Sequence, residues 1–271
     1  MFAREGWRGG EEGNMRVPKT LDGNTKLYRI MSLERFLQML ESGMNTLVMP
    51  LMWEDPFEKT YELLYSEEVL HLGQYTIDVK VPIGKDYYGQ CWSMCNESDA
   101  LWRTYTNAKT QRSVKIETTI GQLEDSFKEI DNKVDFYIGQ VSYTKNTNEK
   151  ISVVVNELYD SLECYKDKTR RVLAALLSKR YAYKYEEEIR LIAYNENNSE
   201  KTFKYKIPQI DKFINRIELD PWTSKESISV IESAIRQRKW NDFKTWNVDI
   251  ICSSLYKDIT PEEFKSMKIY S

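Results

Sequence analysis

Strand patterns and helix patterns alternate along this chain without the regular strand–helix–strand repeat of a parallel sheet. Runs rich in β-branched and aromatic residues predict strands, and apolar residues three and four positions apart predict helices. Because the two kinds of element are mixed irregularly, the sequence predicts an α+β fold whose mixed, mainly antiparallel sheet is flanked by helices. Strands are expected at 26–30, 46–49, 89–93, 113–117, 136–143, 185–194, 202–207, 214–219 and 248–252. Helices are expected from 33 to 42 and from 56 to about 70, after Ser98, and near 120–130, 152–179 and 225–238.

The chain is expected to form one domain with an N-terminal arm. Residues 1–25 are rich in glycine and charge and predict a flexible arm. Residues 26–271 show no internal repeat and no linker, and they are long enough to bury a large core. The sequence therefore predicts a single α+β domain over 26–271.

Composition excludes several classes of protein. A formal net charge of −3 and a pI near 5.6 argue against a general nucleic-acid-binding surface. No glycine-rich phosphate loop is present, and no apolar run approaches the ~20 residues that span a bilayer, so no membrane association is expected.

The histidine and cysteine content further limits the catalytic and metal sites that the chain can form. The only histidine, His71, lies in an apolar context, and the simpler interpretation is an ordinary partly buried side chain. The four cysteines lack paired zinc spacing, so no metal is expected. We expect free thiols in a reducing cytoplasm. The cysteines are Cys91, Cys95, Cys164 and Cys252.

Three blocks place carboxylates or hydroxyls beside large aromatic rings. They are Trp53–Glu58, Cys91–Ser93 with the following Ala100–Tyr105, and Tyr185–Arg190. Polar groups beside rings are costly to bury and are common where a polar ligand lies against a ring face. The blocks therefore predict a site.

Each block also has a simpler interpretation. In a strand, Glu186, Glu188 and Arg190 share one face, which on an edge strand would be solvated. Asp55 fits a helix cap, with Pro56 at the first helical position.

Two further features bear on the site. Trp102 and Tyr105, three positions apart on a short helix, fit core packing. Arg29 is harder to explain structurally, because a charged residue in an apolar strand needs a partner.

Taken together, the blocks resemble the bacterial family catalogued as domain of unknown function 2971. The resemblance rests on Tyr28-Arg29, Glu54–Glu58, Trp92-Ser93, Trp102–Tyr105, and Tyr185–Arg190 after a helix that carries Lys179, over roughly residues 26–220. One departure is that 107–111 lacks the glycine usual after the Trp-x-x-Tyr helix.

A more distant resemblance, to ADP-ribosyltransferases, lies in the order of an arginine on the first strand, a serine or tyrosine midway and a late Glu-x-Glu strand. It implies an ADP-ribosyltransferase-like fold and an NAD pocket, with NAD as substrate. It implies catalytic roles for Glu188, Glu186 and Arg29, with Glu188 stabilising oxocarbenium charge. The implied NAD-binding residues are Tyr28, Arg29, Ser93, Trp102, Tyr105 and Asp55.

Three functions remain open at this point. The first is an NAD-dependent ADP-ribosyltransferase-like effector of a bacterial or phage conflict system, acting on an unidentified protein or nucleic acid. The second is a metal-dependent phosphodiesterase or nuclease, with Asp55, Glu58, Glu186 and Glu188 as oxygen ligands. The third is a non-enzymatic partner-binding module. An oligomer is compatible with all three.

Overall fold

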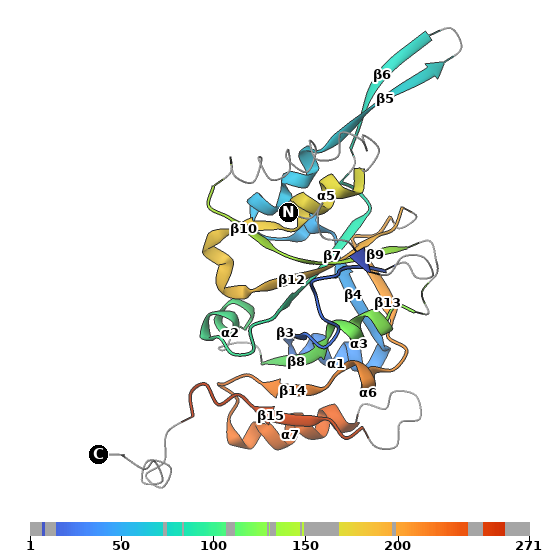
Figure 1. Cartoon of the computed structure of the whole chain (residues 1–271). Helices are drawn as coiled ribbons and strands as arrows, with labels where there is room; N and C mark the ends of the chain where they lie inside the picture. The colour runs from blue at the N-terminus through green and yellow to red at the C-terminus, as the bar shows by residue number, and fades with distance from the viewer. Residues whose placement is uncertain are drawn as a thin grey trace. The chain divides into compact units, whose positions relative to one another are not determined.

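In this computed structural model the chain divides into two compact units, both of which combine strands with helices (Figure 1). The first unit comprises Met1–Tyr28, Gly43–Asn96 and Thr118–Phe213, and the second Arg29–Ser42, Glu97–Glu117 and Ile214–Ser271. The α+β prediction is confirmed, whereas a single domain over 26–271 stays a prediction. The structure describes residues 7–8, 15–72, 75–82, 84–106, 112–128, 130, 134–146, 148, 168–196, 199–237 and 246–257.

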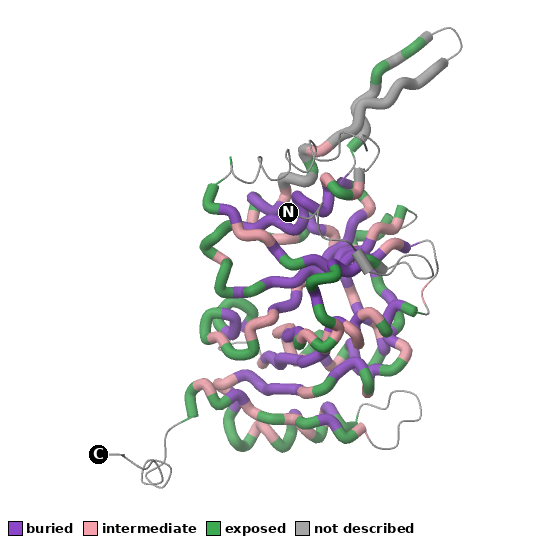
Figure 2. The backbone as a smooth tube through the Cα atoms, viewed as in Figure 1, coloured by how far each residue is buried: buried purple, intermediate pink, exposed green. Residues whose placement is uncertain are grey.

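The main sheet of the first unit is mixed and mainly antiparallel, as predicted. Its central strand β12 pairs antiparallel with β9 on one side and with β7 on the other, while β2 joins β9 in parallel. β4 pairs with both β13 and β7, and Tyr28 of β3 pairs with Ser93. Figure 2 shows β12 and β7 buried along almost their whole length. The strands are β1 (Trp7–Arg8), β2 (Met15–Pro18), β3 (Lys26–Ser32), β4 (Met44–Val48), β7 (Tyr87–Ser93), β9 (Asp135–Gln140), β12 (Glu188–Tyr194) and β13 (Thr202–Lys206).

Two small sheets and six short helices complete the described part of the first unit. β5 (Tyr65–Leu72) and β6 (Tyr75–Pro82) form an antiparallel hairpin, and β10 (Ser142–Thr144) pairs in parallel with β11 (Ser178–Arg180). The helices are η1 (Pro50–Met52), η2 (Pro56–Leu63), α3 (Ile120–Asp125), α5 (Lys168–Leu176), η3 (Tyr181–Glu186) and α6 (Ile210–Phe213).

Part of the predicted N-terminal arm belongs to this folded unit. Strand β2 lies within residues 1–25 and pairs with β9 through Met15 and Arg16. Val17 and Leu21 are buried among the core residues. Apolar burial of this kind anchors a terminus that composition alone marks as flexible. Residues 1–6 and 9–14 of the predicted arm lie outside the described residues.

The second unit holds the rest of β3 together with β8 (Ser113–Thr119), β14 (Arg216–Leu219) and β15 (Asp249–Cys252). β14 pairs antiparallel with β8 and parallel with β15. Its helices are α1 (Leu33–Ser42), α2 (Asp99–Tyr105) and α7 (Lys225–Gln237). Serine hydroxyls cap α1 and α2: the hydroxyl of Ser32 accepts the amide hydrogen of Arg35, and that of Ser98 accepts the amide hydrogen of Leu101.

Three element predictions are wrong in part. The helix predicted to reach residue 70 ends with η2 and is followed by β5. Of the helix predicted over 152–179, residues 151–167 lie outside the described part, and α5 covers Lys168–Leu176. Lys179, which was predicted on this helix, lies on β11.

The third partial error concerns the strand predicted from residue 185. Residues 181–186 instead form η3, in which three residues per turn place Tyr183 and Glu186 on one side, and the strand begins at Glu188. Glu187, with φ of 43°, ends this helix.

Two glycines let neighbouring segments approach the central sheet closely. A Cβ atom at Gly89 would lie 2.5 Å from Cζ2 of Trp53, and one at Gly139 would overlap the side chain of Leu177. Gly139 on β9 is the register partner of Arg190 on β12. The absence of side chains at these positions therefore makes room for the groups that cover this face of the sheet.

We expect Gly89→Ala to lower the free energy of unfolding by about 1–3 kcal/mol, because the added methyl displaces the indole of Trp53. Chemical denaturation followed by circular dichroism measures the loss. The double variant Gly89→Ala/Trp53→Phe removes the overlap and should lose less than the sum of its two single changes. A Gly89→Ala protein as stable as the parent would contradict the close-packing argument.

Candidate functional site

The site of the first unit is organised by Arg190, the central charged residue of β12. Its side chain is 0% exposed. The guanidinium donates to Oε1 of Glu188 at 2.7 Å, to Glu58 and to the carbonyl of Leu176, and it lies 4.2 Å from the ring centroid of Trp53. Burial lowers the pKa of Arg190, but Glu188, Cys91 and Glu58 raise it well above its ordinary value, so the cation persists.

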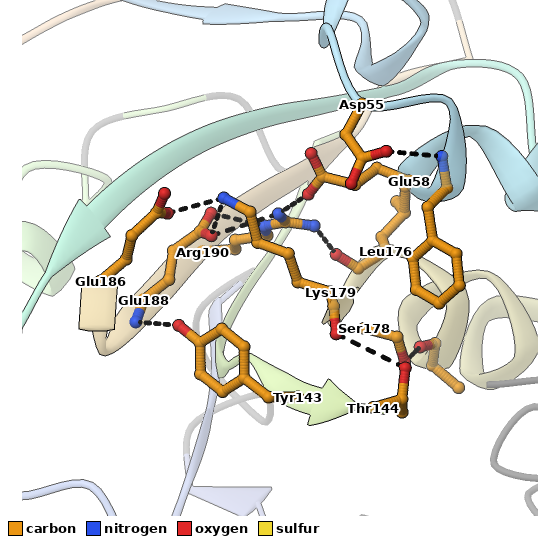
Figure 3. Close-up of polar contacts among 12 residues, drawn as sticks. Asp55, Glu58, Tyr143, Thr144, Leu176, Ser178, Lys179, Glu186, Glu188 and Arg190 are labelled. Carbon is orange, nitrogen blue, oxygen red and sulfur yellow. Dashed lines mark hydrogen bonds and ion pairs between the residues drawn. The ribbon is translucent and has the colours of Figure 1, made fainter. Parts of the chain in front are cut away.

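Lys179 on β11 joins the two glutamates of the last block. Its ammonium donates to Oε2 of Glu186 at 2.6 Å and to Oε2 of Glu188 at 2.9 Å (Figure 3). The same nitrogen lies 4.9 Å from the ring centroid of Tyr183. Lys179, Glu186 and Glu188 are all buried. The two carboxyl groups are therefore held together by one ammonium.

The two carboxyl groups have opposite pKa shifts. Burial raises the pKa of Glu188, but Arg190 and Lys179 more than offset it and lower the pKa to about 2. For Glu186, burial dominates over Lys179 and raises the pKa above its ordinary value. Such divergence between neighbouring carboxyls is typical of sites with separate acid and base roles.

Neighbouring strands fix the position of Glu188. Its amide donates to the hydroxyl of Tyr143 at 2.8 Å (Figure 3). Burial, with nearby Glu188 and Glu186, raises the pKa of Tyr143 to about 12. Cys91 on β7 is the register partner of Arg190. Burial and the charge of Glu188 raise the pKa of the Cys91 thiol well above its ordinary value. Both groups are therefore neutral near pH 7.

The Asp-Pro-Phe-Glu block forms the start of η2, as its capping pattern predicts. Oδ1 of Asp55 accepts the amide hydrogen of Phe57 at 3.0 Å. The same oxygen lies 3.2 Å from a guanidinium nitrogen of Arg180, whose central carbon is 5.2 Å from the Phe57 ring centroid. Glu58, one residue further, reaches Arg190. The block thus caps a helix and also supplies a carboxylate to the buried network.

The structure brings several predicted site residues together in the first unit. Glu186 and Glu188 contribute to the ion pairs in Figure 3, and Asp55 pairs with Arg180. The hydroxyl of Ser93 donates to the carbonyl of Glu186 at 2.6 Å, and Ser93 is the register partner of both Glu188 and Tyr28. The simpler interpretation of the last block is wrong, because β12 is paired on both sides, and Glu188 on β12 and Glu186 at the end of η3 are both buried rather than solvated on an edge.

Three other predicted residues belong to the second unit. Arg29 is half-buried on β3, and Tyr105 is 44% exposed at the end of α2. Trp102 is 0% exposed, with the Lys115 ammonium 5.5 Å from its ring centroid, so in this structure it is a core side chain. The convergence of these three residues with Glu188 stays a prediction.

Sequence analysis placed Arg190 on one strand face with Glu186 and Glu188 but did not predict its central role, and it missed the role of Lys179. Arg190 lies between Ile189 and Leu191, the same apolar strand context that drew attention to Arg29. The rule that a buried charge needs partners, when applied to Arg190, would have identified it as a site residue. Lys179 carried no such signal, because it was expected on a helix.

The carboxylates of the alternative metal site each face a cation. Asp55 faces Arg180, Glu58 faces Arg190, and Glu186 and Glu188 face Lys179. Within the described residues, no group of three or more His, Cys, Asp or Glu side chains is placed to hold a metal ion. Ion pairing accounts for the positions of these four carboxylates.

Comparisons with known proteins give partial matches. The sequence model of the family described as "Protein of unknown function (DUF2971)" matches residues 101–191, which confirms that resemblance over this segment, about a third of the chain. No curated protein matches significantly. In the described part of the chain, no helix has the length and apolarity needed to cross a membrane.

Three solved structures of Thermus sp. 2.9 DarT are also similar to this chain. The complex with ADP-ribosylated ssDNA is 9% identical, with a TM-score of 0.39, over 87% of this chain and 97% of that one. The complex with carba-NAD+ has 10% identity, a TM-score of 0.34 and coverages of 85% and 96%. The complex with NAD+ is 10% identical, with a TM-score of 0.33, over 86% of this chain and 98% of that one. At these TM-scores, the similarity supports neither a fold assignment nor a function for this chain.

We expect Glu188→Gln to lower the free energy of unfolding at pH 7 by about 3–5 kcal/mol, because it leaves Arg190 and Lys179 without their shared carboxylate. At a solvent-exposed position the same change would cost little. Glu187→Gln, at the exposed neighbouring position, should leave stability unchanged.

The pH dependence checks the same prediction. The pKa of Glu188 is lower in the folded protein than its ordinary value of 4.5, so its stabilisation is present above about pH 4.5 and is lost as the pH falls toward about 2. Unfolding measured from pH 6 to pH 2 should show this loss in the parent and a flatter profile in Glu188→Gln. Parallel profiles in the two proteins would contradict the assignment.

Proposed function

We propose that this protein transfers ADP-ribose from NAD to a macromolecular acceptor. The observation that carries the proposal is the pair Glu186 and Glu188, which Lys179 bridges. The pKa of Glu186 is raised and that of Glu188 is lowered. An ionised carboxylate beside a carboxyl that holds a proton more strongly is suited to breaking a glycosidic bond. The order of the sequence blocks, which resembles that of ADP-ribosyltransferases, supports the same chemistry.

The proposed reaction uses the fixed charge of Glu188. The bond between C1′ of the ribose and the nicotinamide nitrogen breaks, and its electron pair leaves with nicotinamide. Positive charge then develops on the ribose and is stabilised by Glu188. An acceptor nucleophile bonds to C1′ and loses a proton. Because Glu188 is buried in the ligand-free structure, ligand binding must expose it.

Asp55 has a property expected of an NAD-binding residue. Its Oδ2 atom is buried and has no hydrogen-bond partner among the described residues, while Oδ1 caps η2. An unpaired buried carboxylate oxygen is costly unless a ligand or water donates to it. A ribose hydroxyl is a suitable donor. Tyr28, Arg29, Ser93, Trp102 and Tyr105 remain proposed members of the same site.

The cellular setting is part of the proposal. Cys91, Cys95 and Cys252 form no disulfide, which fits a reducing compartment such as the cytoplasm. An enzyme that consumes NAD and modifies a macromolecule would suit an effector in bacterial or phage conflict.

The experiment is nicotinamide release from NAD by the purified protein. We expect release by the parent and a rate lower by about a hundredfold or more in Glu188→Gln, after normalisation to the folded fraction, because one electrostatic contributor is lost. Glu187→Gln is the matched control and should retain the parent rate. NAD should also raise the melting temperature of the parent, since it binds the folded state.

Two results would contradict the proposal. One is the absence of both nicotinamide release and a melting shift in millimolar NAD, which would favour a partner-binding module. The other is an equal loss of activity in the two Gln variants. Cleavage of nucleic acid that EDTA abolishes, without nicotinamide release, would instead favour the metal-dependent alternative.

A further inference from the structure

Lys179 is held in place from three directions. Its ammonium bonds Glu186 at the end of η3 and Glu188 at the start of β12, and it faces the ring of Tyr183. Its own strand, β11, is paired with β10. A buried lysine with this many contacts has little rotational freedom, so it fixes the two carboxyl groups relative to each other.

The network around Lys179 has an uneven charge balance. Among its described members, the carboxyls of Glu58, Glu186 and Glu188 face the cations Lys179 and Arg190. Each of the five is at most 7% exposed. Two positive charges against three negative charges leave one negative charge in excess if every group is ionised. Because an uncompensated buried charge is costly, the network favours one bound proton.

The contacts distinguish the two carboxyls that Lys179 bridges. Glu188 receives bonds from both Lys179 and Arg190, and Glu58 bonds Arg190. Glu186 bonds Lys179, which it shares with Glu188. Tyr143 and the Cys91 thiol also face Glu188, and both are neutral near pH 7. Of the two carboxyls bridged by Lys179, Glu186 therefore contacts one cation and Glu188 contacts two, so Glu186 is the less compensated of the pair, in agreement with the raised pKa that burial gives it.

We propose that Lys179 is a positioning residue that keeps Glu188 ionised and leaves the proton of the pair on Glu186. Its part in transfer rests on the proposed function, since Glu188 must carry a negative charge to stabilise the developing positive charge. The location of the proton is a property of the ligand-free protein and is measurable without any substrate.

The test follows the glutamate carboxyls by carbon NMR in ligand-free protein. In the parent, one carboxyl should titrate above the ordinary glutamate range, and Glu186→Gln should remove that signal. In Lys179→Met, the titration midpoint of the remaining pair should rise by about one pH unit or more, because an opposite charge in contact is lost. Lys184→Met, an exposed lysine of η3, is the matched control and should leave the midpoint unchanged. An unchanged midpoint in folded Lys179→Met would overturn the proposal.

A second variant keeps the test decisive if Lys179→Met fails to fold. The double variant Lys179→Met/Glu186→Gln removes the cation together with one of its carboxylates, so folding should recover and Glu188 should titrate above its value of about 2 in the parent. Failure of this double variant to fold, or a Glu188 midpoint that stays near 2, would overturn the role of Lys179.

Activity separates this proposal from the proposed function. If the parent releases nicotinamide, Lys179→Met should shift the pH profile of kcat by the same amount as it shifts the carboxyl midpoint. Lys179→Arg keeps the positive charge and should restore most of the parent pH profile. If the parent releases none, the proposed function fails, while the carboxyl titration still decides where the proton lies.

Discussion

The buried guanidinium of Arg190 is the interaction on which the site of the first unit depends. It lies on β12 and is buried, so its charge must be balanced by the protein itself. Glu188 comes from the same strand, whereas Glu58 comes from a block 132 positions earlier in the sequence. One desolvated cation therefore ties the central sheet to η2.

The surrounding structure is explained by this requirement. Gly89 and Gly139 lack side chains on neighbouring strands, which lets Trp53 and Leu177 cover the face around Arg190. The end of α5 contributes the Leu176 carbonyl to the same guanidinium. Lys179 then extends the network to Glu186. The aromatic rings and carboxylates that stand out in the sequence serve first to close this network, and the proposed chemistry uses the charge balance that results.

The sequence predicted the kinds of element better than the partners of the charged residues. Local signals, such as the caps at Ser32 and Ser98, placed α1 and α2 correctly, because capping depends on neighbours a few positions away. The strand predicted from residue 185 starts three residues later, at Glu188, because residues 181–186 form η3 and Glu187 ends it with a positive φ. The pairing of Arg190 with Glu58 could not be predicted, since it depends on a register between distant segments.

The most direct test of the central role of Arg190 is a double-mutant cycle between Arg190→Met and Glu58→Gln, measured by urea unfolding. Each single variant should lose about 3–5 kcal/mol, because it leaves a buried charge without its partner. The double variant should lose less than the sum, with a coupling energy of about 1–3 kcal/mol. Losses that add within about 0.5 kcal/mol would contradict the account, since they would show that the two side chains stabilise the fold independently.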